Sequence, residues 1–487
     1  MSQHNQDMTQ YDQNGRLHTE TSSLEEQQYA YKQALGLLAL NVQGELILPG
    51  DHNYEAERGI WNGAFDRHPA AIVRCLDAED VRVAVNFARK QAMPLSVRSG
   101  GHNVSGYSTN DNGLVIDLSS MKAITVDPLH RTARLEPGLT SGEVANALEP
   151  YGLAMTTGDT ATVGMGGLLL GGGIGWMVRS YGLALDHLRA VELVTADGQV
   201  LRASAEENPE LFWGLRGGGG NFGVATAFEV NLDSGGTILG GAIFYEAAEA
   251  ERILQGYARH ATAAPDGLST EALLILAPPA PFIPSDKQGT PVVAILVCYT
   301  GNLSEGEQVI APLRHLATPI ADLVAPMPYP GIFAFTEVGE IRGLQHHVRS
   351  QFFETLSDDM LHTLVEAAQA IMSPETLVQL RVLGGAMSRV ASNATAFAHR
   401  DKQGMMLVTN FGPPSADSAD LDARTQRVFQ ALSPYANGVY MNFLADEGEQ
   451  RIREAYTPAT YERLVALKNQ YDPTNLFHLN QNIKPTL

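Results

Sequence analysis

The chain has 487 residues, 44% of them hydrophobic and 18% charged, and its formal net charge is −21. That length suggests two or three domains, and the acidic balance argues against nucleic acid or an anionic membrane as a partner. The two cysteines, Cys75 and Cys298, form no CxxC pair. This argues against a disulfide framework and a thiolate metal site, and we expect no bound metal.

The first 30 residues are polar and contain no apolar stretch typical of a secretory signal. We therefore expect residues 1–30 to be a flexible tail and the protein to be cytoplasmic. Residues 30–48 follow as a short helix and a connection.

The next part of the chain predicts a mixed α+β domain that extends to about residue 232. Asp77 is typical of a helix N-cap, and Asp197-Gly198 is typical of a type I′ hairpin turn. Strands are predicted at 70–74, 95–98, 114–118, 131–135, 191–195, 199–203 and 224–230, and helices at 77–89 and 142–151.

From residue 240 to about 437 the elements become longer, which indicates a second domain with a sheet. Strands are predicted at 273–276, 292–299, 378–383 and 405–410, and helices at 253–260 and 360–371. The chain ends in a turn-forming, amide-rich stretch from Tyr471 to Ile483, which suits a segment that closes over a neighbour.

Glycine is concentrated in one part of the chain, where sixteen of the 47 glycines lie between Gly158 and Gly223. Because glycine costs backbone entropy on folding, this concentration indicates that the backbone closely approaches a ligand. In Ser99-Gly100-Gly101-His102-Asn103, which follows a strand, paired glycines can turn successive N–H groups toward a pyrophosphate. The run from Thr157 to Gly175 can lie flat along an extended ligand.

A membrane helix and a nicotinamide cofactor fit these glycines less well. Residues 160–178 carry no charge, but seven of them are glycine, which argues against a membrane helix. A formal GxGxxG spans 218–223, yet a predicted strand follows it where a dinucleotide site needs a helix, so we reject NAD. The sequence contains no P-loop, HExxH or GxSxG motif.

Four motifs in this order resemble the berberine-bridge-enzyme-like flavoproteins of the vanillyl-alcohol-oxidase fold group: RSGGHN, GDTATVGMGG with GGGIG, RGGGGNFGV and YDPTNLFHLNQNI. The resemblance covers about residues 40–485. It implies an α+β fold, with a two-part PCMH-type FAD-binding domain at 31–238 whose core is about 67–235. It also implies a substrate domain on an antiparallel sheet at 239–437, and a segment at 438–487 that returns to the flavin.

The resemblance implies FAD bonded covalently through His102. Many relatives carry a second link through a cysteine, but this chain has Thr160 there, and a threonine hydroxyl is a poor nucleophile without an adjacent base. We therefore expect one covalent bond. The positions that match the cofactor motifs are Ser99, Gly100, Gly101, His102, Asn103, Gly106, Thr157, Gly158, Asp159, Thr162, Val163, Gly166, Gly167, Gly172, Gly173, Gly175, Val224, Asn442, Asn480 and Asn482.

The catalytic base is less clear from the sequence. Relatives that oxidise alcohols often use a tyrosine where this chain has Phe443, which cannot take a proton. Tyr440 and His399 are the remaining candidates, although each has an alternative role in packing. A base is needed only if the substrate loses a proton as hydride moves to flavin N5. Tyr107 occupies a position that borders the oxygen path in relatives, which puts direct use of oxygen in question.

The sequence thus predicts an FAD-linked oxidoreductase that acts on a small organic substrate such as an alcohol, sugar or secondary metabolite. Oxidase activity is the first prediction. Oxygen or another acceptor takes the electrons. The alternatives are a flavin dehydrogenase of hydroxy acids with a different acceptor, and a flavin-binding protein without turnover.

Overall fold

The computed structural model describes residues 20–486 and has the expected α+β fold. A small mixed sheet forms one end, in the order β1-β2-β4-β3, with β3 and β2 parallel to β4 on either side. Its strands are β1 (Glu45–Ile47), β2 (Ala71–Arg74), β3 (Leu95–Arg98) and β4 (Leu114–Asp117). The carboxyl end of β3 places the Ser99–Asn103 turn at one edge of this sheet.

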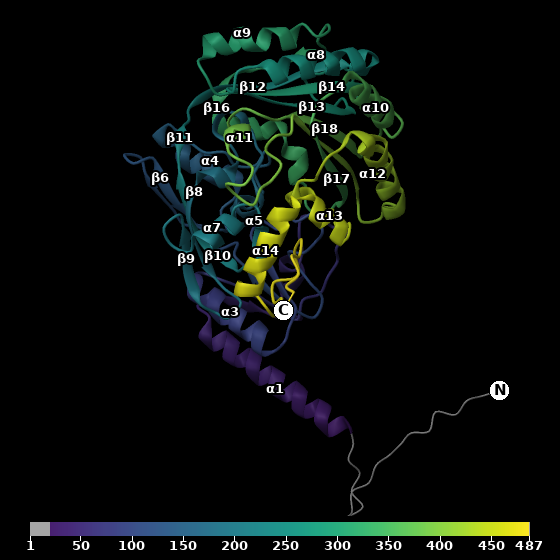
Figure 1. The fold of residues 1–487 in the computed structure, drawn as a ribbon. Coiled ribbons are helices and arrows are strands. Elements are labelled where there is room, and N and C mark those ends of the chain that lie inside the picture. The colour runs from purple at the N-terminus through teal and green to yellow at the C-terminus, as the bar shows by residue number, and fades with distance from the viewer. Residues whose placement is uncertain (1–19, 487) are drawn as a thin grey trace, which may run out of the picture.

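Helices cover this first sheet. α3 (Ala78–Lys90) begins where the Asp77 carboxylate accepts hydrogen bonds from the N–H groups of Glu79 and Asp80. α1 (Glu20–Asn41) packs on α3 and projects from the body (Figure 1).

The expected tail at 1–30 needs correction here: residues 1–19 lie outside the described part, but 20–30 belong to this helix, since Glu, Gln and Ala favour it. α2 (Tyr54–Glu57) is a single turn.

A five-stranded antiparallel sheet follows, in the order β5-β6-β10-β8-β9. Its strands are β5 (Ile124–Asp127), β6 (Thr132–Leu135), β8 (Leu188–Val194), β9 (Val200–Ser204) and β10 (Val224–Asn231). The predicted hairpin is confirmed, but its turn is not type I′: Gly198 has φ +83°, whereas Asp197, which that turn type also requires at positive φ, is not in the left-handed region. β7 (Leu153–Ala154) pairs with β11 (Asp233–Ser234) beside it.

Short helices pack around this sheet: α4 (Ser141–Leu148), α5 (Met165–Gly171), α6 (Val178–Tyr181) and α7 (Pro209–Leu215). The glycine run is therefore not extended throughout, because its middle forms α5. Four of the seven α5 residues are Met or Leu, and Met165, Leu168 and Leu169 are buried in the core, which outweighs the glycines' low helix propensity.

The substrate domain is one large antiparallel sheet in the order β15-β12-β14-β13-β18-β19-β17, with β16 also paired to β12. Its strands are β12 (Thr237–Glu246), β13 (Leu268–Leu276), β14 (Pro291–Tyr299), β15 (Ala321–Asp322), β16 (Ala325–Pro328), β17 (Gln345–Phe353), β18 (Thr376–Val382) and β19 (Gly404–Gly412). β12 and β17 were not predicted from the sequence, since β12 contains a glycine pair and β17 begins with polar residues.

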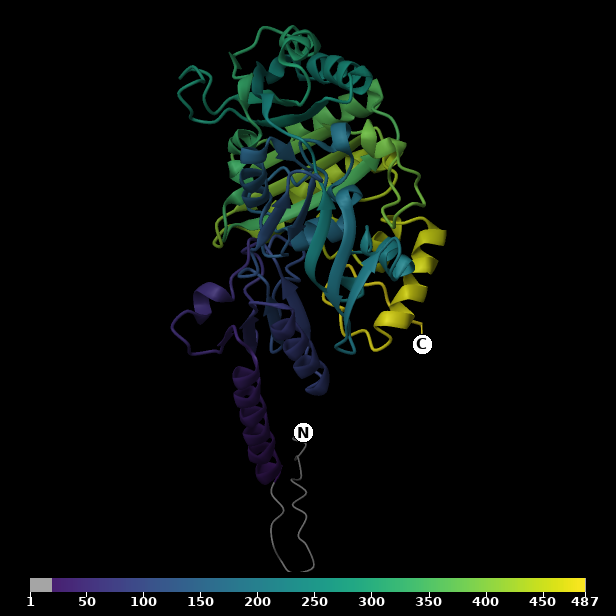
Figure 2. The same cartoon turned by 90° about the vertical axis from the view of Figure 1, so that its left-hand side faces the viewer.

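Helices cover the outer face of this sheet and leave its inner face toward the FAD-binding domain (Figures 1 and 2). They are α8 (Ala250–Ala263), α9 (Leu303–Arg314), α10 (Asp358–Gln369) and α12 (Ser418–Leu432), with α11 (Ala386–Arg389) as a single turn elsewhere. α13 (Glu449–Glu454) and α14 (Pro458–Tyr471) then return the chain, and α14 packs on α7.

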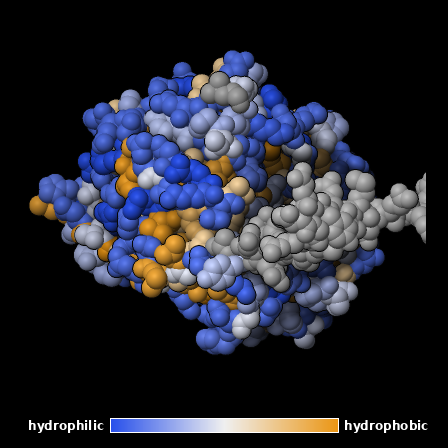
Figure 3. Space-filling model, turned by 90° about the horizontal axis from the view of Figure 1, so that it is seen from below, coloured by the Kyte–Doolittle hydropathy of each residue, from blue (hydrophilic) through white to orange (hydrophobic). Residues whose placement is uncertain are grey.

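Among residues 20–486, no helix combines the length and the apolar character that a membrane crossing requires. The face seen in Figure 3 is largely hydrophilic, with hydrophobic side chains gathered in smaller patches.

Candidate cofactor and substrate site

A cavity lies between the glycine-rich turns of the FAD-binding domain and the inner face of the substrate sheet. Most of the predicted cofactor residues line it: Ser99, Gly100, Gly101, His102, Asn103, Gly158, Asp159, Val163, Gly166, Gly167, Gly173, Val224, Asn442 and Asn480. Tyr440 lines it as well, together with Thr160, Tyr107 and Phe443. Gly219, Gly220 and Gly223, from the formal GxGxxG, also contribute to the wall.

The turn before His102 depends on its glycines for a close backbone approach. A Cβ atom on Gly100 would lie 2.4 Å from the backbone nitrogen of Gly164. Gly101 has φ +75°, a conformation that favours glycine. The Ser99 hydroxyl accepts a hydrogen bond from the Gly166 N–H at 3.3 Å. The two glycine-rich stretches named by the sequence therefore form one packed unit.

His102 is partly buried and its imidazole is uncharged. Its ring stacks on Trp61 with 5.2 Å between centroids, and Trp61 stacks in turn on His346 at 3.9 Å. Burial lowers the pKa of His102 to about 3, with the charges of Arg342 and His346 adding to the effect. Nε2 of His102 lies 2.9 Å from Oγ1 of Thr162, which fixes the orientation of the ring. The imidazole is thus held neutral, the form in which it is nucleophilic.

Several glycines of the second run pack against the returning C-terminal segment. A Cβ on Gly171 would lie 2.0 Å from Oδ1 of Asn442, and one on Gly172 would lie 2.8 Å from the Tyr440 ring. Gly167 and Gly220 are different, because a Cβ on either would meet no atom within 4 Å. Both line the cavity, so their bare backbone faces the space that a ligand would fill.

Tyr440 is buried and held by two donors. Its hydroxyl oxygen accepts hydrogen bonds from the Gly173 N–H at 2.8 Å and from Nδ2 of Asn442 at 3.0 Å. Burial raises the pKa of Tyr440 to about 12. The phenol is therefore protonated at neutral pH and makes a poor general base.

The structure does not bring His399 to the cavity. Its Nε2 lies 2.9 Å from the Glu454 carbonyl oxygen, and its ring packs on Phe352 at 5.1 Å. Gly438, at φ +95°, approaches the ring so closely that a Cβ would lie 2.2 Å from it. His399 thus joins the C-terminal return to the substrate sheet, and its candidacy as a catalytic base is not supported.

Six predicted cofactor residues are not part of the cavity lining. Gly106, at φ +71°, packs on Phe65, and Gly175 packs on the Thr157 carbonyl. Thr162 contacts the His102 ring, as described above. The six residues are Gly106, Thr157, Thr162, Gly172, Gly175 and Asn482.

Alternate residues of the large sheet form the second side of the cavity, which we call the substrate wall. They do so because successive side chains of a strand point to opposite faces of the sheet. Along β18, Val378, Leu380 and Val382 belong to the core under the helices, while the alternate residues face the cavity. The facing residues of the sheet are Leu273, His346, Val348, Leu377, Gln379, Arg381, Leu407, Thr409 and Phe411. Gln379 and Arg381 were not predicted as site residues, although two polar residues that alternate with apolar ones in a predicted strand are a usable signal.

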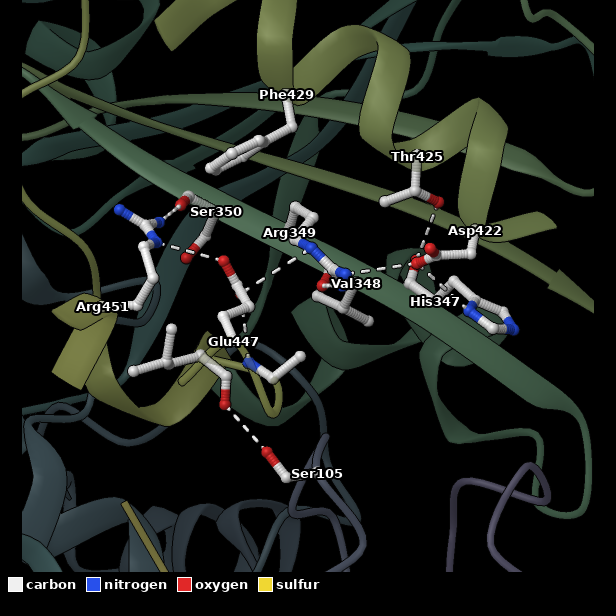
Figure 4. Close-up of polar contacts among 12 residues, drawn as sticks. Ser105, His347, Val348, Arg349, Ser350, Asp422, Thr425, Phe429, Glu447 and Arg451 are labelled. Atoms are coloured by element: carbon white, nitrogen blue, oxygen red, sulfur yellow. Dashed lines mark hydrogen bonds and ion pairs between the residues drawn. The ribbon is translucent and has the colours of Figure 1, made fainter. Parts of the chain in front are cut away.

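The C-terminal segment ties the two domains together (Figure 4). The Ser105 hydroxyl, three residues after His102, donates to the Leu444 carbonyl at 3.0 Å. Glu447 lies between Arg349 of β17, at 3.8 Å, and Arg451 of α13, at 3.1 Å. Figure 4 also shows Arg349 reaching Asp422 of α12, at 3.2 Å. These contacts hold the loop after His102 against the edge of the sheet.

A buried lysine joins the end of the chain to the 219–223 turn. Nζ of Lys468 donates to the carbonyls of Asn221 and Phe477 and to the Asp472 carboxylate, at 2.7–3.0 Å. Asp472 in turn accepts from the N–H of Phe477 at 2.9 Å. This arrangement positions Asn480, a cavity residue.

The residues present fit FAD. Oδ1 of Asn480 is buried without a hydrogen-bond partner at the cavity wall, and so is Nε2 of His346. An elongated ligand with donors and acceptors would satisfy such atoms. The bare backbone at Gly167 and Gly220 suits close approach of a pyrophosphate.

Two family comparisons agree with this geometry. The FAD binding domain family matches residues 69–204, and the family described as berberine and berberine like matches residues 439–484. The first match contains the His102 turn and most of the glycine run, and the second contains the segment that holds Tyr440 and Asn480.

Relatives match over nearly the whole chain. (R)-6-hydroxynicotine oxidase of Paenarthrobacter nicotinovorans is 34% identical over 464 residues, covering 92% of this chain and 98% of its own. Xylooligosaccharide oxidase of Thermothelomyces thermophilus is 27% identical over 502 residues, covering 94% and 95%.

Solved structures share the fold. The crystal structure of 6-hydroxy-D-nicotine oxidase from Arthrobacter nicotinovorans has a TM-score of 0.82 at 31% identity, covering 91% of this chain and 98% of its own. Berberine bridge enzyme in complex with (S)-reticuline has a TM-score of 0.82 at 23% identity, covering 93% and 99%, and shows the fold alone. The chain therefore belongs to the berberine-bridge-enzyme-like FAD-linked oxidoreductases and is an enzyme of the oxidase type.

Proposed function

We propose that this enzyme holds FAD covalently through His102 alone, oxidises a small and largely apolar substrate, and passes the electrons to oxygen. The observation that carries the proposal is the cavity itself, with glycine backbone and a neutral histidine on one side and the substrate sheet on the other. Bound FAD supplies the acceptor for a hydride from the substrate carbon.

Each side of the cavity has a separate task in this proposal. The N–H groups of the Ser99–Asn103 turn and the glycines near Gly167 and Gly220 hold the pyrophosphate, and among residues 20–486 no lysine lines the cavity to do so. His102 supplies the attachment point. Thr160 lines the cavity in place of a cysteine and forms no second link.

The substrate wall is mostly apolar and excludes water. Leu273, Leu377, Leu407, Val348 and Phe411 face the cavity from the sheet. A sugar oligomer needs many hydrogen-bond partners, and this wall offers few uncommitted ones. It favours a compact organic molecule, as hydroxynicotine is in the relative named for it, over a xylooligosaccharide.

The two alternatives have less support. A hydroxy acid dehydrogenase needs a free cation for the substrate carboxylate, but Arg381, the cavity's one arginine within the described residues, contacts two carboxylates. A flavin-binding protein without turnover is favoured by Phe443 alone, and an amine substrate needs no base at that position.

A substrate screen tests the proposal. Oxygen-free enzyme is mixed with small amines, alcohols and sugars while the visible flavin band is recorded, and air is then admitted. We expect bleaching by at least one apolar amine or alcohol and rapid recovery of the band in air. An unbleached flavin with every compound would overturn the enzymatic proposal, and recovery that needs another acceptor would overturn the use of oxygen.

We expect Tyr440→Phe to lower the rate of flavin reduction only about tenfold. The substitution removes a hydrogen-bond acceptor that orients Gly173 and Asn442, but it does not remove a general base. The pH profile of flavin reduction between pH 6 and 9 is expected to have the same shape in both proteins, since the Tyr440 pKa is about 12. A lost inflection in the variant would instead identify Tyr440 as a base.

Tyr107→Val is expected to speed reoxidation of the reduced flavin by oxygen about tenfold, because it removes a bulky ring from the lining near the loop that carries His102. Stopped-flow mixing of the reduced enzyme with aerated buffer measures this rate. Tyr151→Val, at an exposed tyrosine outside the cavity, is the matched control and should change nothing. An unchanged rate in Tyr107→Val would show that this ring does not obstruct oxygen.

A further inference from the structure

A cluster of charged side chains forms the cavity wall where the FAD-binding domain meets the substrate sheet. Arg381 of β18 contacts the Asp159 carboxylate, and its Nε lies 3.3 Å from Oε1 of Glu271 on β13. All three side chains are nearly excluded from solvent, with exposed fractions of 4% for Arg381, 13% for Asp159 and 5% for Glu271.

The guanidinium of Arg381 is fixed on every side. Nη1 donates to the Ile174 carbonyl at 3.2 Å, and Nη2 and Nε donate to Oε1 of Gln379 at 2.9 and 3.1 Å. The Gln379 amide nitrogen donates in turn to Glu271. Every nitrogen of the Arg381 guanidinium therefore already donates to an acceptor within the protein.

The cluster contains two carboxylates and one cation, so it carries one excess negative charge when both acids are ionised. Asp159 and Arg381 are the only carboxylate and the only lysine or arginine that line the cavity within residues 20–486. Glu271 lies behind Arg381 and lines a separate, small cavity. Solvent screens such buried charges weakly, so the excess acts across the cavity.

We propose that this cluster selects a positively charged substrate, a protonated amine on an apolar body, with Asp159 as the residue that faces the cation. The Asp159 carboxylate also accepts the ammonium proton, which must leave the nitrogen before the adjacent carbon gives up a hydride. The inference rests on the proposed function and names its substrate class. A neutral alcohol gains nothing from the excess charge, and an anion is repelled. The formal net charge of −21 acts in the same direction, because it concentrates cations at the surface.

Glu271 makes this selection dependent on pH. Burial raises the pKa of Glu271 to about 7, with Asp159 raising it further and Arg381 and Gln379 lowering it. Raising the pH through 7 ionises Glu271 and adds negative charge, so cation binding tightens. The groups that face this carboxylate are Arg381 and Gln379 of β18, Asp159, and Tyr257 of α8, which itself faces Arg179 of α6.

Three probes that share one ring test the inference on the holoenzyme without oxygen: benzylamine as the cation, benzyl alcohol as the neutral form and benzoate as the anion. Dissociation constants come from the first shift of the flavin band and, independently, from the rise in melting temperature. We expect benzylamine to bind about tenfold more tightly than benzyl alcohol, and benzoate to bind most weakly.

Two variants remove one negative charge each. Glu271→Gln leaves the cavity lining intact and is expected to weaken benzylamine binding about tenfold at pH 8, with benzyl alcohol unchanged. Asp159→Asn is expected to act in the same direction and covers the case in which Glu271→Gln folds poorly. Glu305→Gln, at an exposed site on α9, makes the same change in net charge and should have no effect.

The outcomes separate this inference from the proposed function. Equal binding of all three probes, or an equal effect of Glu271→Gln on benzylamine and benzyl alcohol, overturns the inference even if the flavin is reduced in the substrate screen. A flavin that no compound reduces overturns the proposed function, and the order of the three affinities still decides the inference.

Discussion

His102→Ala is expected to abolish covalent attachment of the flavin completely while the chain still folds. The variant removes the neutral imidazole that lines the cavity next to Trp61, and among residues 20–486 the cavity lining contains no cysteine or other histidine except His346. Flavin fluorescence of the protein band on a denaturing gel measures attachment. The wild-type band should fluoresce, and the variant should release all of its flavin into the acid supernatant.

Two further variants make this result specific. His130→Ala, at an exposed histidine paired with Asp127, should keep full attachment. Thr162→Val removes the hydroxyl 2.9 Å from Nε2 and should slow attachment by about tenfold without preventing it. Fluorescence that persists in His102→Ala would show that another residue, with His346 or Thr160 first to be tested, forms the bond.

Lys468→Met is expected to lower the free energy of unfolding by about 4 kcal/mol, since it leaves the fully buried Asp472 without its cation. The carbonyls of Asn221 and Phe477 lose their donor at the same time. Thermal unfolding followed by circular dichroism measures the loss. The variant should also retain FAD poorly when His102 is replaced, because Asn480 and the 219–223 turn lose their common support.

The matched control for this prediction is Lys484→Met. Lys484 also pairs with a carboxylate, Glu449 at 2.9 Å, but its side chain is 61% exposed. Solvent screens an exposed ion pair, which therefore contributes little to stability, so the control should melt close to the wild type. Equal melting temperatures for Lys468→Met and Lys484→Met would contradict the role assigned to the buried pair.

The cofactor could be predicted from the sequence because its signals are local. A glycine pair after a strand and a dense glycine run indicate close backbone approach wherever they fold, and the resemblance added the role of His102. Strands such as β3, β14 and β19 follow from short-range patterns of apolar residues. The departures at Thr160 and Phe443 are also visible in the sequence alone.

The charge of the substrate site could not be predicted in this way. Asp159, Glu271 and Arg381 are far apart in the chain, and only the register of β13 against β18 and the docking of the two domains bring them together. The position of His399 could not be predicted either, because its close packing against Gly438 places it outside the cavity.

The sequence by itself thus determined the fold class and the cofactor, because backbone conformation and motif spacing are properties of short segments. The tertiary structure decided which side chains face the substrate, since strand register sends alternate residues to opposite faces of the sheet. It also decided their ionisation, because the burial and neighbours that set the pKa of His102, Tyr440 and Glu271 exist only in the folded chain.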